Sequence, residues 1–496
     1  MVAIIVIGGA VSFFALIPPL NSTGTGSSHS VATPTSTSAT TCPAIVPAKD
    51  QKLKGTTFDA VTEFGLPTSN TSPNAITVAP DGSVWFGENG LPGVGHLFPN
   101  GTLSEYRLPF SMNSEESVCG NLAEIWGVAF WNGEAWAANE GQAQLEGVNP
   151  TTGVITNVTL KSQITPYTLA VEPGGNLWFT DLNGPEIGMV TAGSYAVQYY
   201  QFPGNESWLS AYVTFASSTL GYVLAINPIL AAVDPTAITS IVYSFNPSSP
   251  TPTFQQVGGN ATLYEPSSIA VGGGGLWLTE HSGTGMAFFN ATSSKWTIFP
   301  TSTVPYVPFT LTYFDASSGS TVWFNEHYAN KIGLISDNGT LLTEYSASDP
   351  PQDNFSLIPN TLTVAIGDGR TWFTQWTGNI VGFVNQSYVP PFSVSTPNSA
   401  VQIQAGGKVQ VQLQLSGQDS RNLSLQFSDN EFDNGTARNI VFTPSLSAFP
   451  SLDGRQTITV GIATASTLKP GEYVAAITVT DGLVLQSIYV TIVVTG

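Results

Sequence analysis

Charged side chains are scarce in this sequence, and basic ones are the scarcest of all. Only 9% of the 496 residues are charged, and 13 Lys plus Arg stand against 33 Asp plus Glu, which leaves a formal net charge of −20. Soluble domains ordinarily carry about 25% charged residues. Because no basic patch or stripe is present, we expect no nucleic-acid partner.

Cysteine and histidine are almost missing as well. The chain has two cysteines, Cys42 and Cys119, and four histidines. This excludes a zinc site built from a cysteine cluster, and no phosphate-binding loop, nucleophile elbow or calcium-loop consensus occurs. Outside the cell, the two cysteines would form a disulfide that ties residue 42 to the domain after it. The alternative is two unrelated thiols.

The longest run without any charge lies at the N-terminus. Residues 1–20 are apolar and just long enough to span a bilayer as a helix. No Lys or Arg precedes the run and no Ala-X-Ala site follows it. We therefore expect a transmembrane anchor at 1–20, with a cleaved signal as the alternative. Residues 21–57 begin with a Ser/Thr-rich stretch and are expected to form a stalk.

A short block recurs along the chain at intervals of about 45 residues, which is the spacing of propeller blades. Each copy is an apolar run, a Gly/Asp turn and a second apolar run with a Trp, the pattern of a β-hairpin. A double interval before the fourth of these Trp residues holds one divergent copy, with Tyr222 in place of Trp. We therefore predict a seven-bladed β-propeller over residues 58–389. The marker residues are Trp85, Trp136, Trp178, Trp277, Trp323 and Trp372.

The outer strand of a blade has a signature of its own, as in LSEYRLP at 103–109 and LLTEYSA at 341–347. The last blade lacks this strand because Pro390-Pro391 interrupts the chain, whereas a spare copy, VTEFGLP, stands at 61–67. We predict that 61–67 completes the last blade. Such closure removes the open sheet edges that the ring would otherwise present.

From residue 390 onward the Trp blocks stop, and strands with period-two alternation follow, such as GEYVAAITVTD. About 105 residues of this pattern are typical of an immunoglobulin-like β-sandwich, expected here at 390–496. The predicted fold class is therefore all-β. It consists of a seven-bladed β-propeller followed by an immunoglobulin-like β-sandwich, with an N-terminal transmembrane helix.

Asn-X-Ser/Thr sequons are frequent and mostly fall in predicted turns, where a glycan can be accommodated. Ordinary polar turns are the alternative explanation. Together with the leader, the sequons favour a glycoprotein on the outside of the cell. Beyond Asn21 in the stalk, the sequon residues are Asn70, Asn100, Asn157, Asn205, Asn260, Asn290, Asn338, Asn354, Asn385, Asn422 and Asn434.

The repeat DG-x-(V/L)-WF-(T/G/N)-E, followed by NKIG and TEY, is clearest in VWFNEHYANKIGLISDNGTLLTEYS at 322–346. Over residues 58–389 the chain resembles the streptogramin B lyase (virginiamycin B lyase) family. The resemblance implies a seven-bladed propeller that opens a cyclic ester by elimination. It also implies Mg²⁺ held by Glu side chains and a His base in a Pro-His-x-Ile motif. Such an elimination needs both a positioned base and a cation that stabilises the enolate.

None of the matching positions in this chain carries His. Glu265-Pro266 keeps the Glu-Pro pair that precedes one family His, but Ser267 follows it. The general base of the family therefore does not carry over. The residues in its place are Asn74, Trp126, Tyr167, Ser267, Phe309 and Asn360.

Polar residues follow each blade Trp, where the second strand ends and one mouth of the central channel is expected. Glu280-His281 and Glu326-His327 occupy these positions in adjacent blades. Hard cations prefer oxygen ligands, so Glu280, Glu326 and Glu265 are the candidate metal ligands, and His281 and His327 the candidate catalytic residues. We assign no cofactor; Mg²⁺ or Ca²⁺ is the cation that this set would take. The alternative is a blade consensus whose carboxylates bond loop amides, with neighbouring residues on opposite faces of the strand.

Two functions follow from these observations. The preferred one is an extracellular, surface-anchored glycoprotein whose propeller is a binding or envelope-structural module, with a cell-envelope protein or glycan as partner and the membrane contacted through residues 1–20. The alternative is a Mg²⁺-dependent carbon–oxygen lyase acting on a cyclic ester or glycan. Of the remaining histidines, His29 lies in the stalk and His96 is expected in a surface turn.

Overall fold

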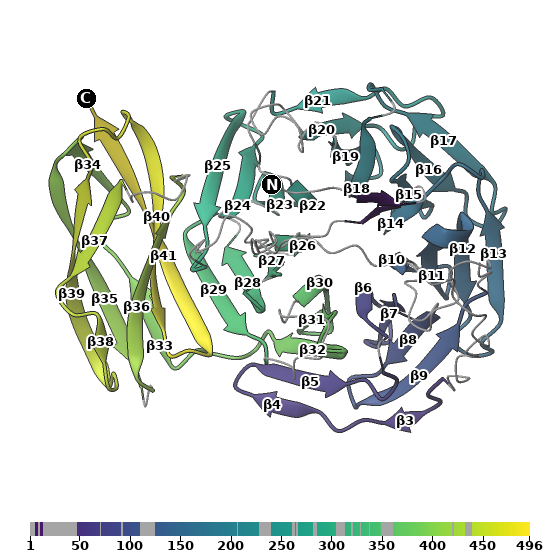
Figure 1. Cartoon of the computed structure of the whole chain (residues 1–496), viewed down its shortest axis with the longest axis horizontal. Helices are drawn as coiled ribbons and strands as arrows, with labels where there is room; N and C mark the ends of the chain where they lie inside the picture. The colour runs from purple at the N-terminus through teal and green to yellow at the C-terminus, as the bar shows by residue number, and fades with distance from the viewer. Residues whose placement is uncertain are drawn as a thin grey trace, which may run out of the picture.

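The computed structural model of the chain is built almost entirely from β-strands (Figure 1). One 3₁₀ turn, Glu140–Gln142, is the exception among the described residues. The all-β fold class is thus confirmed. The structure describes residues 5–7, 10–12, 47–69, 71–90, 93–109, 125–205, 207–227, 240–259, 263, 266–280, 285–303, 313–318, 321–327, 329–336, 338–348, 361–418, 421–431 and 439–496.

Seven sheets of the described chain stand around one axis (Figure 1). Within each of these sheets, strands that follow one another in sequence pair antiparallel, in the manner of a β-meander. The innermost strands of neighbouring sheets are in contact all the way round, and the innermost strand of the last sheet also contacts that of the first. The sheets therefore form a closed ring, and we number them in chain order.

The strands of the ring have the following bounds. Sheet 1 holds β6 (Pro73–Val78), β7 (Val84–Glu88), β8 (Gly93–Leu97) and β9 (Thr102–Arg107), sheet 2 holds β10 (Ile125–Trp131), β11 (Glu134–Asn139), β12 (Gln144–Val148) and β13 (Ile155–Thr159), and sheet 3 holds β14 (Pro166–Val171), β15 (Leu177–Asp181), β16 (Glu186–Val190) and β17 (Val197–Gln201). Sheet 4 holds β18 (Leu209–Ser217), β19 (Leu220–Ile226), β20 (Ser240–Phe245) and β21 (Gln255–Val257), and sheet 5 holds β22 (Pro266–Gly272), β23 (Gly275–Glu280), β24 (Gly285–Asn290) and β25 (Lys295–Pro300). Sheet 6 begins with β26 (Tyr313–Ser318), β27 (Thr321–Glu326), β28 (Lys331–Ser336) and β29 (Leu341–Ser346), and sheet 7 with β30 (Thr361–Gly367), β31 (Arg370–Gln375) and β32 (Ile380–Asn385).

An aromatic pair in the second strand ties each typical sheet together. The Trp is buried, and the Phe after it packs over a glycine of the third strand. A Cβ atom on Gly95 would lie only 2.0 Å from Cζ of Phe86, so the ring occupies the space that a side chain would need. The opposed pairs are Phe86–Gly95, Phe179–Gly188, Phe324–Gly333 and Phe373–Gly382.

The ring is closed by a strand from the N-terminal side. The strand β5 (Val61–Gly65) pairs antiparallel with β32, so that Phe64 lies opposite Val381 and Thr62 opposite Phe383. This confirms the prediction that 61–67 completes the last blade. A further strand, β4 (Thr56–Phe58), then pairs with β5.

Two other sheets also gain an outer strand, which the sequence did not predict. The short β3 (Gln51–Lys52) pairs with β9 of sheet 1. The last strand of the chain, β41 (Val484–Thr495), pairs antiparallel with β29 of sheet 6, with Leu485 opposite Glu344. Sheet 6 therefore continues without a break from the ring into the C-terminal part of the molecule.

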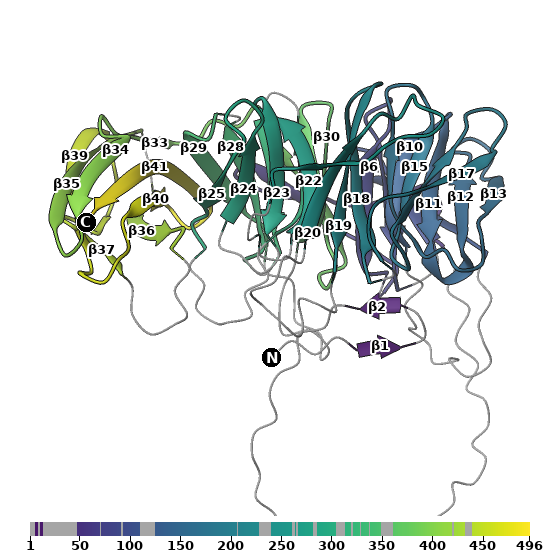
Figure 2. The same ribbon diagram turned by 90° about the horizontal axis from the view of Figure 1, so that it is seen from above.

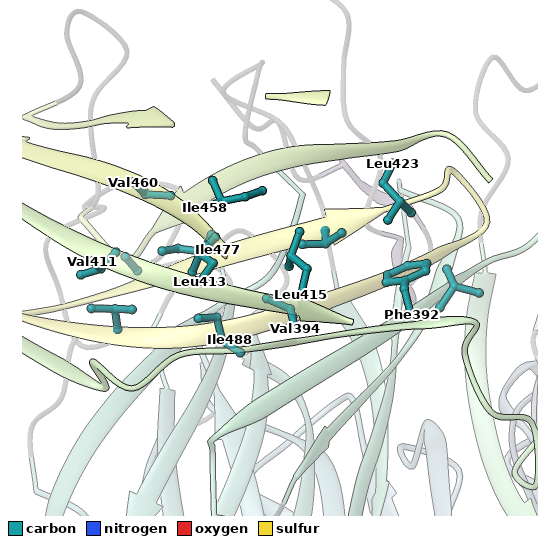
Figure 3. Close-up of a cluster of buried hydrophobic side chains, with 14 of the residues drawn as sticks. Phe392, Val394, Val411, Leu413, Leu415, Leu423, Ile458, Val460, Ile477 and Ile488 are labelled. Atoms are coloured by element: carbon teal, nitrogen blue, oxygen red, sulfur yellow. The ribbon is translucent and has the colours of Figure 1, made fainter. Parts of the chain in front are cut away.

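The C-terminal part lies beside the ring and not on its axis (Figures 1 and 2). One sheet has the order β33 (Phe392–Ser395), β35 (Lys408–Gly417), β39 (Gly454–Thr464), β37 (Ile440–Pro444). The second contains β34 (Ala400–Gln404), β41, β40 (Gly471–Thr480), β36 (Leu423–Asp429) and β38 (Ala448–Phe449). Aliphatic side chains of both, among them Val411, Leu413, Ile458, Ile477 and Ile488, form one buried cluster (Figure 3).

Side chains reinforce the junction between this part and the ring. Arg421 donates two hydrogen bonds to the Asp59 carboxylate, at 2.6 and 2.9 Å. The Tyr489 ring of β41 packs edge-on against Phe299 of β25, with centroids 5.1 Å apart. The two parts are therefore joined by a strand ladder, an ion pair and a shared apolar cluster.

The expected transmembrane helix over 1–20 is not found. Within the described residues, no helix is long and apolar enough to cross a membrane. Ile5–Ile7 and Ala10–Ser12 are instead two paired strands, β1 and β2. Their Ile and Val residues are β-branched, and such residues favour strands. Cys42 and Cys119 lie outside the described residues, and the domain boundaries at 20, 57 and 389 stay predictions.

The Phe–Gly packing predicts a position-specific effect on stability. Gly95→Ala should lower the free energy of unfolding by about 1–3 kcal/mol, because the new methyl group must displace the Phe86 ring. Gly65→Ala is the control, since no heavy atom lies within 4 Å of its added Cβ. This variant should stay within about 0.5 kcal/mol of wild type in urea unfolding. Equal loss in both variants would contradict the packing role of Gly95.

Candidate functional site at the bulge end of the ring

All seven innermost strands carry a register shift where they begin. In β6 it falls between Pro73 and Ile76, and in β14 between Pro166 and Leu169. The corresponding shifts lie in β10, β18, β22, β26 and β30. Bulges re-aim side chains and are frequent beside functional sites. We call this end of the ring, where innermost strands begin and second strands end, the bulge end, and the opposite end the turn end.

The polar residues three positions after each Trp lie at the bulge end, opposite the first residue of the innermost strand. Their backbone placement agrees with the expectation of a shared mouth. Their side chains, however, are almost completely buried in the sheets, at 0–2% exposure. The pairs are Pro73–Glu88, Ile125–Asn139, Pro166–Asp181, Pro266–Glu280, Tyr313–Glu326 and Thr361–Gln375.

Glu326 and His327 point to different neighbours. The Glu326 carboxylate accepts a hydrogen bond from the Thr303 hydroxyl, in the segment after sheet 5. Nδ1 of His327 lies 2.9 Å from the carbonyl oxygen of Thr361, in sheet 7. The two side chains thus have partners on opposite sides of sheet 6, Glu326 in the segment after sheet 5 and His327 in sheet 7.

The other candidates can be placed only in part. Glu280 is fully buried at the end of β23, whereas Glu265 and His281 lie outside the described residues. Over the described ranges, no group of three or more His, Cys, Asp or Glu side chains is placed to hold a metal ion. The proposed metal set of Glu265, Glu280 and Glu326, and the catalytic pair His281 and His327, therefore stay predictions.

A buried pair of carboxyl groups occupies the end of sheet 1. Glu88 of β7 accepts a hydrogen bond from Arg107 Nη1 at 2.7 Å, and Arg107 Nη2 lies 3.8 Å from Oε2 of Glu105 in β9. Burial and the neighbouring Glu105 carboxyl raise the pKa of Glu88 to about 8, in spite of Arg107. The positive charge of Arg107 does not offset the cost of moving the charged Glu88 carboxylate out of water.

Sheet 6 repeats this arrangement. Nζ of Lys331 lies 3.9 Å from Glu326 Oε2 and 4.0 Å from Glu344 Oε1. Burial and the Glu344 carboxyl raise the pKa of Glu326 well above its ordinary value. Glu326 is therefore half of a buried acid pair, which differs from the channel-facing ligand expected from the sequence.

The outer-strand Glu of these clusters was missed as a site residue, although its signal is visible. It is the central residue of the SEY, TEY and TEF signatures, Glu105, Glu344 and Glu63. Each is buried, and each stands on an outer strand that carries an added strand. The Glu105 carboxylate also accepts from the Ala48 amide at 2.7 Å. The SEY, TEY and TEF signatures therefore mark outer strands whose free edge is covered by a further strand.

The expectation of a surface turn for His96 is wrong. His96 lies in β8 directly opposite Trp85, and the two rings stack with centroids 4.0 Å apart. Its Nε2 lies 2.8 Å from the Ser83 hydroxyl. Burial lowers the pKa of His96 to about 4. His96 is therefore a neutral packing residue that fills the place of an apolar side chain.

Aromatic and amide side chains stand at the bulges where the family resemblance implies a His base. Trp126 of β10 and Tyr167 of β14 are half-buried, with ring centroids 5.7 Å apart. Trp126 also meets Trp376, which follows β31, edge-on at 6.0 Å. Asn74 of β6 is fully buried, and its amide atoms have no partner among the described residues. In ring order these residues come from sheets 7, 1, 2 and 3.

Two of the aligned bulge positions shift in the structure. The residue opposite Glu326 is Tyr313, and that opposite Gln375 is Thr361. The segment around Phe309 and the residue Asn360 lie outside the described residues. Both strands begin later in the chain than the sequence repeat predicts.

The fold and these contacts define a β-propeller protein with a C-terminal β-sheet unit attached to one side. Virginiamycin B lyase from Staphylococcus aureus is similar in structure at 20% sequence identity, over 66% of this chain and 98% of that one, with a TM-score of 0.51. A catalytically inactive form of that enzyme with quinupristin gives the same values. A streptogramin B lyase structure matches at 21% identity, 66% and 97% coverage and a TM-score of 0.49.

No protein-family model and no curated protein matches the sequence. At about 20% identity, the structural likeness shows the fold and nothing finer. The resemblance inferred from the Trp repeat is thus confirmed at the level of the β-propeller.

The acid pair of sheet 1 predicts a pH-dependent stability. Glu88 has a folded pKa of about 8 against an ordinary value of 4.5, so the folded state keeps a proton that the unfolded chain has lost. The stability from this group is complete below about pH 4.5 and is lost as pH rises through 8. Glu88→Gln should therefore flatten the fall in unfolding temperature between pH 6.5 and 8.5, a window above the titration of His96.

The control for this test is Glu472→Gln, at an exposed carboxylate in β40. It should keep the wild-type slope. Identical slopes in wild type and Glu88→Gln would contradict a protonated Glu88 in the folded state.

Proposed function

We propose that this chain is an extracellular cell-surface glycoprotein whose seven-bladed β-propeller binds a component of the cell envelope without cleaving it. In this proposal the seven sheets are seven blades, and the C-terminal unit is an immunoglobulin-like sandwich fixed to sheet 6 through β41. The apolar residues 1–20 direct the protein outward as a cleaved signal. The low share of charged residues and the many sequons support the extracellular location.

One observation carries the choice of binding over lyase chemistry. The bulges are present in all seven innermost strands, yet the aligned positions of the implied base in sheets 1, 2, 3 and 5 hold Asn74, Trp126, Tyr167 and Ser267. An elimination beside an ester carbonyl needs a base of suitable pKa at that place. Neutral amide, indole, phenol and hydroxyl groups are the groups that bind a neutral ligand.

The side chains at the bulge end favour a glycan as the bound component. Trp126, Tyr167 and Trp376 offer partly exposed aromatic faces, against which the C–H face of a sugar ring can pack. The buried amide of Asn74 can donate and accept hydrogen bonds. None of these four residues is charged, so the set offers no cation to a phosphate or carboxylate group. A neutral oligosaccharide fits this set better than a phosphorylated or acidic ligand does.

A pair of tyrosines in sheet 3 allows a matched test. Tyr167 stands at the bulge end and Tyr195 at the turn end, and both are half-buried. In calorimetry of the full chain with a panel of neutral envelope oligosaccharides, Tyr167→Ala should weaken binding about tenfold, the effect of ~1.4 kcal/mol. Tyr195→Ala should bind as wild type does. Absence of binding by the wild type, or equal loss in both variants, would refute the site.

A further inference from the structure

An asparagine caps the turn after the third strand in six of the seven sheets, as far as the chain is described. Its Oδ1 accepts the backbone N–H two residues later, which is the hydrogen bond of an Asx turn. The donor–acceptor pairs are Thr102–Asn100 at 2.9 Å, Thr151–Asn149 at 3.0 Å, Ser248–Asn246 at 3.0 Å, Thr292–Asn290 at 2.9 Å, Thr340–Asn338 at 3.2 Å and Ser387–Asn385 at 3.0 Å. The same local structure therefore recurs around the ring.

These six turns differ in one respect that matters for modification. Four of them read Asn-X-Ser/Thr with X other than Pro, at Asn100, Asn290, Asn338 and Asn385. The other two read Asn149-Pro150-Thr151 and Asn246-Pro247-Ser248, and proline at the middle position disqualifies a sequon. The chain thus contains acceptors and non-acceptors in equivalent turns.

The four acceptors are accessible and lie at one end of the molecule. Asn100, Asn338 and Asn385 are exposed, and Asn290 is half-buried. Each stands where a third strand ends, which is the turn end of the ring. Within the described chain, the hydrogen bonds of these asparagines use Oδ1 and leave Nδ2 unengaged. A glycan on Nδ2 would therefore leave the Asx turn intact.

We propose that Asn100, Asn290, Asn338 and Asn385 are N-glycosylated, so that carbohydrate covers the turn end of four consecutive sheets, 5, 6, 7 and 1. The proposal rests on the extracellular location proposed above. The donor is a lipid-phosphate-linked oligosaccharide: Nδ2 forms a bond to C1 of the first sugar, the bond from C1 to the phosphate oxygen breaks, the lipid phosphate leaves, and the amide loses one proton.

This arc of four glycans has two physical consequences. It supplies hydration over this part of the turn end. It also keeps the turn end from stacking on another protein surface. The bulge end, with Asn74 and the aromatic side chains, is then the end directed toward the bound glycan of the envelope.

The test is glycopeptide mass spectrometry on the full chain, purified from cells that export it and digested with chymotrypsin. The wild type should carry glycans at the four asparagines and none at Asn149 or Asn246. Pro150→Ala creates Asn-Ala-Thr, the same tripeptide as at Asn290, and should add a glycan at Asn149. Asn338→Asp keeps an acceptor for the Thr340 amide and should lose that glycan without a change in unfolding temperature.

Glycosylation at other sequons shows which proposal fails, the glycans at the turn end or the extracellular location. Asn157 lies on β13, Asn205 follows β17 and Asn422 precedes β36. Glycans on any of these three with none on the four turn-end asparagines would overturn this inference alone. Complete absence of glycans would overturn the glycoprotein proposal together with it. An unmodified Asn149 in Pro150→Ala would show that the turn is not an acceptor site.

Discussion

The antiparallel ladder between β5 and β32 is the interaction on which the rest of the ring depends. It brings residues about 300 positions apart into register, and without it sheet 7 would end in an open edge. Hydroxyl groups add to the closure, because Thr363 and Thr374 both donate to the carbonyl oxygen of Asn74, at 2.6 and 2.7 Å. These bonds join the bulges of sheets 7 and 1. The arc of sheets that holds the candidate binding site therefore includes the seam of the ring.

Several of the few acidic residues of this chain lie inside it. Glu63, Glu88, Glu105, Glu326 and Glu344 are all buried, and a third strand, an outer strand or an added strand covers each of them. In sheets 1 and 6 a buried pair of acids with one base joins two strands, and burial together with the second acid raises the pKa of Glu88 and of Glu326. The added strands β3, β4 and β41 cover the outer strands that carry this Glu. The C-terminal unit is attached at such an edge.

Much of the fold could be predicted from the sequence because its determinants are local. Trp85 and Phe86 with Gly95, the turn residues between strands and the spare strand at 61–67 all repeat a pattern that can be read along one chain. The added strands could not be predicted in this way. Gln51–Lys52 is too short to show any periodicity, and the pairing of β41 with β29 depends on how two separately folded units meet.

The site was harder to predict than the fold. The alternation of side chains along a strand predicts that Glu326 and His327 have different partners. It does not predict that these partners are Thr303 and Thr361. The pairing of Glu326 with Glu344 could not be predicted, because the two residues stand on different strands of sheet 6, β27 and β29. His96 was misjudged because its sequence neighbours, Gly95 and Pro99, suggest a turn, whereas the stacking with Trp85 is a cross-strand contact.

The central claim is that the propeller keeps the scaffold of the lyases it resembles and binds without performing their chemistry. The most direct measurement incubates the purified full chain with a streptogramin B antibiotic and Mg²⁺ and separates the products by chromatography. The account predicts no ring opening above a control without protein. Ring opening that exceeds this control and disappears when a chelator is added would contradict it.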